Sequence, residues 1–222
     1  MSTALVLFSG GQDSTTCLYW AKKKFDEVFA IGYDYGQKHA VEITQAKQIA
    51  QLANVPYTVF LLENMLSGSA LTEHEKSMNE KHIVAKDLPA SFVPGRNALF
   101  LTLAAGYAYN RGIAHLVGGM CQTDYSGYPD CRKVFIDAQQ VSLSLAMETD
   151  FHIHTPLMYL SKAETWKMAA DLDILDIIVD YTHSDYNGDR SEKHDWGYGK
   201  LDNPASILRA NGYKQAKKKG WI

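Results

Sequence analysis

The chain has 222 residues, of which 46% are hydrophobic and 21% charged, and its formal net charge is −3. A chain of this length can bury a sizeable core without disulfides or metals, and it has no apolar run of the ~18 residues that a membrane span needs. We therefore expect a cytoplasmic protein without membrane contact, and the slightly acidic balance does not favour nucleic acid as a partner.

The first part of the sequence alternates apolar strands with helices. A continuous apolar run at 4–8 is typical of a strand buried on both faces. Strand and helix patterns then follow one another, with helices at 13–24 and 41–54 and strands at 27–34 and 57–62. This order predicts an α/β fold with a Rossmann-like parallel sheet and helices on both faces.

The middle and the end of the chain are less regular. The polar stretch 63–92 predicts a long excursion, of the kind that forms lids or stays disordered. Ser161 and Glu164 have the spacing of a capping box, which predicts a helix to about residue 171. We place one main domain at 1–180 and an irregular or helical appendage at 181–222. Further predicted elements are helices at 97–111 and 133–148 and strands at 115–118 and 151–154.

The three cysteines, Cys17, Cys121 and Cys131, are scattered along the chain without a Cys-x-x-Cys pair. An odd, dispersed set encodes neither a disulfide framework nor a thiolate metal cage. Cys17 lies inside a predicted helix and is expected to pack there. The lysine cluster at 214–219 is expected to be a solvated face, not a binding patch.

A glycine-rich turn joins the first strand to the first helix, and it is the strongest chemical signal in the sequence. Glycines let the backbone approach phosphate oxygens, hydroxyls add donors, and a helix N-terminus offers unpaired N–H groups. Asp13 can hold Mg²⁺ on the phosphates, although it could also be an ordinary N-cap of the helix. The predicted phosphate-binding residues, to which the resemblance described below assigns ATP, are Phe8, Ser9, Gly10, Gly11, Gln12, Asp13, Ser14, Thr15 and Thr16.

Other polar residues follow the predicted strands at their carboxyl ends, where open α/β sheets bind ligands. Arg96 could clamp a phosphate or carboxylate, and Lys162 could neutralise negative charge on a bound group. The segment 124–132 has the rings and polar groups to stack on a flat base and read its edges. Each of these also has a simpler interpretation as a turn, core or surface residue. Predicted substrate-binding residues are Asp34, Gln37, Asp124, Tyr125, Tyr128, Asp130 and Arg132.

The turn is not a Walker loop, because no Gly-Lys-Ser/Thr follows at the required spacing. Its Ser-Gly-Gly-x-Asp-Ser pattern resembles the pyrophosphate loop (PP-loop) of the N-type ATP pyrophosphatases. Within that superfamily the chain resembles the 7-cyano-7-deazaguanine synthase family of queuosine biosynthesis. Five separated motifs carry this resemblance, at 8–16, at 34–39 with Glu42, at 94–97, at 124–132 with Phe135, and at 155–157 with 161–162.

The resemblance implies an ATP-dependent carbon–nitrogen ligase. The family converts 7-carboxy-7-deazaguanine and ammonia to the nitrile through an adenylated carboxylate and an amide, and a homodimer is implied. Asp13, Arg96 and Lys162 would serve catalysis with ATP and Mg²⁺, mainly by positioning and charge stabilisation. Two alternatives stay open: a related enzyme that takes another deazapurine or stops at the amide, and a non-catalytic nucleotide-binding paralogue.

The chain departs from the family near its C-terminus, where the family carries four zinc-binding cysteines. This sequence keeps the surrounding frame but has Asp185, Lys200, Asn203 and Ser206 at the ligand positions. Tetrahedral structural zinc prefers Cys or His, so we expect no zinc and no other resident metal at these residues. A replacement set built from His183, Asp185, His194 and Asp195 is conceivable, as is a faint pair of His152 and His154 on one strand face.

Overall fold

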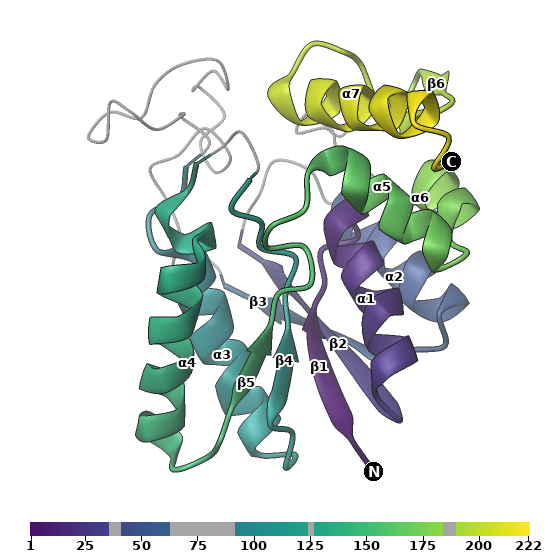
Figure 1. Cartoon of the computed structure of the whole chain (residues 1–222). Coiled ribbons are helices and arrows are strands. Elements are labelled where there is room, and N and C mark those ends of the chain that lie inside the picture. The colour runs from purple at the N-terminus through teal and green to yellow at the C-terminus, as the bar shows by residue number, and fades with distance from the viewer. Residues whose placement is uncertain (36–40, 63–91, 124–126, 184–189) are drawn as a thin grey trace.

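A computed structural model of the protein describes residues 1–35, 41–62, 92–123, 127–183 and 190–222 (Figure 1). The predicted excursion at 63–92 lies outside these residues except for Phe92. No helix of the described ranges is long and apolar enough to cross a membrane.

Five parallel strands form the main sheet, in the order β3-β2-β1-β4-β5. The chain runs outward from β1 to β3 and then returns to the other side of β1. This reversal creates a topological switch point between β1 and β4, the position where open α/β sheets bind ligands. The strands are β1 (Thr3–Leu7), β2 (Glu27–Asp34), β3 (Tyr57–Leu61), β4 (His115–Val117) and β5 (His152–His154).

Helices cover both faces of this sheet, as the sequence pattern predicts (Figure 1). Successive residues of β1 point to opposite faces: Leu5 packs in the core cluster with α3 and α4, whereas Ala4 and Val6 pack with α1 and α2. A strand buried on both sides needs an unbroken apolar run, which explains the pattern at 4–8. The helices are α1 (Gln12–Lys24), α2 (Val41–Leu52), α3 (Arg96–Tyr109) and α4 (Lys133–Met147), with a short 3₁₀ turn η1 (Pro129–Cys131) before α4.

The elements predicted from periodicity are present, with ends that differ by one or two residues. The capping box is also confirmed: Ser161 accepts a hydrogen bond from the backbone N–H of Glu164, and the Glu164 carboxylate accepts one from the backbone N–H of Ser161. It opens α5 (Lys162–Asp171). A short helix, α6 (Leu175–Tyr181), follows without having been predicted, because seven residues are too few to show a helical period.

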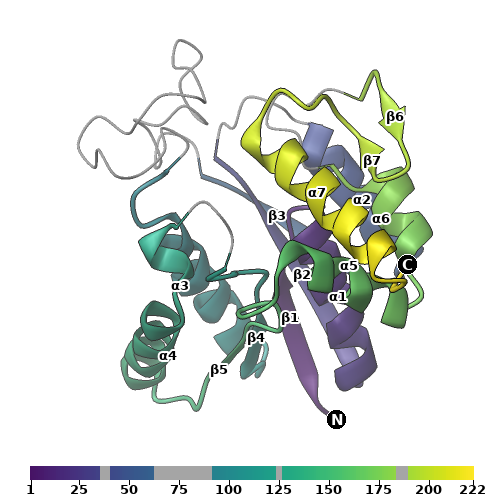
Figure 2. The same cartoon turned by 45° about the horizontal axis from the view of Figure 1, so that its top comes forward.

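The C-terminal segment adds a small hairpin and a long helix. The strands β6 (Lys193–His194) and β7 (Gly197–Tyr198) pair antiparallel, and α7 (Pro204–Lys218) then lies across α5 (Figure 2). Asn203 caps α7 by accepting a hydrogen bond from the Ser206 backbone N–H at 3.0 Å, and Pro204 occupies the first helical turn. The lysines at the end of α7 are exposed, as expected.

Candidate active site

The glycine-rich turn lies directly after β1, at the switch point of the sheet. Gly10 has a φ of +82°, and a Cβ at this position would lie 2.8 Å from the backbone nitrogen of Ala46 on α2. Only glycine avoids both the left-handed strain and this close approach. Position 10 therefore brings the turn into direct contact with the second helix.

Hydrogen bonds between neighbouring residues hold the turn in shape. The Ser14 hydroxyl accepts from the Ser9 backbone N–H at 3.3 Å and donates to the Gly11 carbonyl at 3.2 Å. Gly11 is the N-cap of α1, and no side chain caps the first N–H groups of the helix. These N–H groups and the helix dipole favour an anion at the turn, as the sequence predicts.

The remaining residues of the predicted ATP loop face the interior. Phe8, Gln12, Thr15 and Thr16 are buried, and the Thr16 hydroxyl donates to the Gln12 carbonyl at 2.9 Å. Their side chains therefore support the turn from inside the fold. Contacts of these residues with ATP, which remain predictions, would come mainly from their backbone groups.

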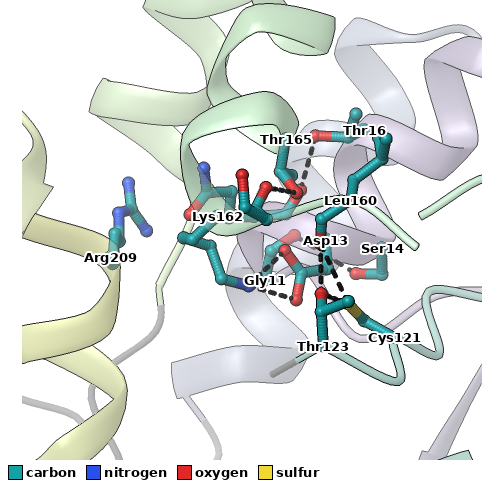
Figure 3. Close-up of polar contacts among 12 residues, drawn as sticks. Gly11, Asp13, Ser14, Thr16, Cys121, Thr123, Leu160, Lys162, Thr165 and Arg209 are labelled. Carbon is teal, nitrogen blue, oxygen red and sulfur yellow. Dashed lines mark hydrogen bonds and ion pairs between the residues drawn. The ribbon is translucent and has the colours of Figure 1, made fainter. Parts of the chain in front are cut away.

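Asp13 is the second residue of α1, so it is not the N-cap that the simpler interpretation assigns to it. Its carboxylate forms an ion pair with Lys162, the first residue of α5, whose Nζ lies 2.9 and 2.8 Å from the two carboxylate oxygens (Figure 3). The Lys162 side chain is only 10% exposed and that of Asp13 28%. Two residues far apart in the sequence thus meet beside the glycine-rich turn.

The segment that follows β4 passes beside Asp13 and contributes small side chains there. A Cβ added to Gly119 would lie 3.4 Å from Asp13 Cβ, so the chain passes close to the start of α1. Cys121 and Thr123 donate hydrogen bonds to the carbonyl of Leu160, just before α5 (Figure 3).

Cys17 is buried as expected, with its thiol 3.7 Å from the Gly118 carbonyl. Burial and the nearby Asp13 raise the pKa of this thiol well above its ordinary value, so it is no candidate nucleophile.

Arg96 begins α3 and forms a second polar group at the same edge of the sheet. Its side chain is hydrogen-bonded to Tyr35, the residue after β2, and lies close to Tyr128 and Asp130. Burial lowers the pKa of the guanidinium, but these three oxygen-bearing side chains outweigh it and raise the pKa overall. Arg96 therefore remains cationic and oriented, as a clamp for an anion requires.

Asp130 and Tyr128, both predicted to bind substrate, have structural contacts here. The Asp130 carboxylate is buried and accepts from the Asn97 backbone N–H at 2.9 Å, so it caps the first turn of α3. The buried Tyr128 ring packs on Phe92, with centroids 5.6 Å apart. Asn97 also donates to Cys131 Sγ at 3.3 Å. The 3₁₀ turn thus holds the N-terminal end of α3, where Arg96 lies.

The other predicted substrate-binding residues lie at the ends of other elements or outside the described residues. Asp34 ends β2 and is partly buried, while Arg132 is exposed at the start of α4. Gln37, Asp124 and Tyr125 lie outside the described residues, so their roles stay predictions.

Glu42 is the site residue to which the sequence assigned no role. It is the second residue of α2, one helical turn before Ala46, which contacts Gly10, so Glu42 lies on the face of α2 directed toward the turn. Burial raises the pKa of its carboxyl to about 7, and the positive charge of Arg96 offsets part of that rise. Glu42 is therefore close enough to Arg96 for the two charges to interact. Sequence position alone gave no signal that a partly buried carboxyl would lie there.

The four C-terminal positions where zinc ligands were considered do not fit that metal. Asn203 and Ser206 are buried and bonded to each other as a helix cap, and Lys200 would bring a positive charge. Asp185 lies outside the described residues. Within the described ranges no three His, Cys, Asp or Glu side chains gather as a metal site. His152 and His154 instead contact His115 through their rings, with centroids 5.2 Å apart in both pairs.

The raised pKa of Glu42 predicts a pH dependence of stability. Between the ordinary value of 4.5 and about 7, the folded protein keeps a proton that the unfolded chain releases, so stability falls as pH rises through this window. The Glu42→Gln variant has no ionisable group at this position, so its stability should not fall in this way as pH rises. Its free energy of unfolding, measured by urea titration, should improve relative to wild type by roughly 2 kcal/mol between pH 5 and pH 8.

Glu27→Gln, at the exposed start of β2, is the matched control and should show no such trend. A constant difference between Glu42→Gln and wild type across this pH range would contradict the burial of an ionisable Glu42.

Comparison of the chain with known proteins identifies its family. The model of the family described as "Queuosine biosynthesis protein QueC" matches residues 3–217. A protein of Bradyrhizobium sp. (strain BTAi1 / ATCC BAA-1182) is 50% identical, covering 96% of this chain and 94% of the relative. A protein of Helicobacter pylori (strain HPAG1) is 44% identical, covering 95% and 94% respectively. Both relatives are named 7-cyano-7-deazaguanine synthase.

Among solved structures, the NMN synthetase from Francisella tularensis has a similar fold, with a TM-score of 0.51 and 14% identity. The match covers 98% of this chain and 86% of that one, and it supports the α/β architecture alone. The family match spans the glycine-rich turn, the Arg96 group and the C-terminal helix. The chain belongs to the QueC family of queuosine biosynthesis proteins.

Proposed function

We propose that this protein is an ATP-dependent ligase that converts 7-carboxy-7-deazaguanine and ammonia to 7-cyano-7-deazaguanine. In the first round the substrate carboxylate attacks the α-phosphorus of ATP, and pyrophosphate leaves. Ammonia then displaces AMP from the acyl carbon and gives the amide. In the second round the amide oxygen is adenylated, and loss of AMP and protons gives the nitrile. The observation that carries this proposal is the Asp13–Lys162 pair beside the glycine-rich turn, in a chain of this family.

The turn would bind the phosphates of ATP. The first N–H groups of α1, which no side chain caps, would donate to the phosphate oxygens. Asp13 is the residue that would hold Mg²⁺, because a carboxylate is the hard oxygen ligand this ion prefers. Mg²⁺ would neutralise phosphate charge. Lys162, already beside the turn, would then contact the oxygens that gain charge as pyrophosphate leaves.

The Arg96 group would receive the deazapurine. Arg96 can bind the carboxylate of the substrate or the adenylate phosphate through two parallel N–H groups. Tyr35 and Asp130 hold the guanidinium in place, so little of its freedom remains to be lost on binding. In this proposal all substrates are small molecules, and the reaction does not require nucleic acid. Because the reaction consumes ATP, we expect the protein to act in the cytoplasm.

Incubation of the purified protein with Mg-ATP, ammonium and 7-carboxy-7-deazaguanine should therefore yield the nitrile, followed by mass spectrometry. Asp13→Asn should lower the rate by about 100-fold or more, because it removes the anionic ligand and leaves Lys162 buried without its partner. Asp150→Asn, whose side chain is 90% exposed just before β5, is the matched control and should keep the wild-type rate.

The alternatives give different results in the same assay. Accumulation of the amide indicates an enzyme that stops after one round. Absence of ATP consumption with any deazapurine indicates a non-catalytic nucleotide-binding paralogue. An Asp13→Asn variant with full activity would contradict the role of the ion pair.

We also propose that the protein works without the zinc expected for the family. The C-terminal helix is held instead by the Asn203 cap and by Arg209, whose buried guanidinium donates to the Trp196 carbonyl at 3.0 Å and to the Ile178 carbonyl at 2.7 Å. Amide, hydroxyl and ammonium groups are poor zinc ligands, whereas these contacts need no metal.

A homodimer is the third element of the proposal. Val134, Val141 and Leu145 on α4 are 74%, 57% and 76% exposed and follow one another at spacings of seven and four, so they form one apolar stripe. A stripe without charges can pack against its own copy about a two-fold axis. A second copy of this chain is the partner that such a self-complementary surface fits.

Native mass spectrometry of the purified protein tests both points in one measurement. We expect twice the monomer mass with no zinc, and a Leu145→Lys variant at the monomer mass. A bound zinc ion in each chain, or a wild-type monomer, would contradict the respective proposal.

A further inference from the structure

The C-terminal helix α7 contacts Lys162 directly. Gly212, in the buried face of α7, lies against the stem of the lysine. A Cβ at position 212 would be 2.7 Å from Lys162 Cγ, 2.9 Å from its Cβ and 3.0 Å from its carbonyl carbon. Contacts this short involve the root of the side chain and the backbone, so they could not be relieved by a flexible end moving away.

The surrounding interface holds α7 at this distance from α5. The indole N–H of the fully buried Trp166 donates to the Arg209 carbonyl at 3.1 Å, and the Tyr213 ring meets Trp166 edge to face at 5.1 Å. Small side chains allow the two helices to approach closely. These are the buried residues Ala163, Ala169, Ala210 and Ala216.

The position of Lys162 matters because its charge must reach the glycine-rich turn. Its side chain runs from the start of α5 to the carboxylate of Asp13 (Figure 3). On the way its Cβ and Cγ lie against Gly212. The lysine stem is therefore confined between α7 on one side and the turn on the other.

We propose that Gly212 is a positioning residue for catalysis, and that α7 holds Lys162 in its place beside Asp13. The inference rests on the proposed ligase function, in which Lys162 acts on the reacting phosphate. It makes the C-terminal segment part of the active site. A glycine inside a helix costs roughly 1 kcal/mol of stability relative to alanine, and at position 212 it leaves the space that the lysine stem occupies.

Gly212→Ala tests the proposal, with Gly106→Ala on α3 as the matched control. A Cβ at position 106 would meet nothing within 4 Å, so this variant should keep the wild-type rate. Gly212→Ala should lower kcat by about 10- to 100-fold while the KM for ATP stays within about threefold, because the turn itself is unchanged. In a Lys162→Ala background, Gly212→Ala should lower kcat no further.

A second variant and a second readout keep the test independent of folding and of the overall function. Trp166→Phe removes the hydrogen bond to α7 without adding bulk, and its effect on kcat should also vanish in the Lys162→Ala background. Acylation of Lys162, followed by mass spectrometry, should be slow in wild type and Gly106→Ala but faster in Gly212→Ala, since the side chain is 10% exposed in the native protein.

Unchanged kcat and acylation in a folded Gly212→Ala protein would overturn the proposal. So would an equal fall in kcat with and without Lys162, because the glycine would then act elsewhere. If the wild type makes no nitrile, the ligase function fails, whereas the acylation rates still decide whether α7 positions the lysine.

Discussion

The ion pair between Asp13 and Lys162 is the interaction on which the organisation of this protein depends. It joins the start of α1, next to the glycine-rich turn, to the start of α5, from which the C-terminal elements α6, β6, β7 and α7 follow. Both partners are largely buried, and removal of one leaves an uncompensated charge that costs about 3–5 kcal/mol. The pair thus stabilises the fold and also places two opposite charges where ATP phosphates and Mg²⁺ would bind.

The rest of the site is built around this pair by packing. Gly10 brings the turn against α2, which in turn carries Glu42 toward Arg96. The Asp130 cap fixes the first turn of α3 and therefore the direction of Arg96. Because these groups are held by neighbouring residues of the same chain, little of their conformational freedom would remain to be lost on phosphate binding.

The sequence predicted the parts of the fold and site that depend on local pattern. The strands and helices of the sheet follow from apolar periodicity, and the turn after β1 follows from its glycines and hydroxyls. The ion pair could not be derived in this way, because its partners are separated by 149 residues. Asp130 has a carboxylate that could bind substrate, yet this carboxylate caps α3. The cap depends on the position of the Asn97 N–H, which lies beside Asp130 only in the folded chain. Nor could local pattern place Gly212 against Lys162.

The most direct test of the account is a structure of the protein with Mg²⁺ and a non-hydrolysable ATP analogue. We expect the phosphates to lie against the backbone of residues 9–14, with Asp13 on the metal and Lys162 Nζ moved from the carboxylate to a phosphate oxygen. Phosphates bound away from the turn, or an Asp13–Lys162 pair unchanged by the nucleotide, would contradict it.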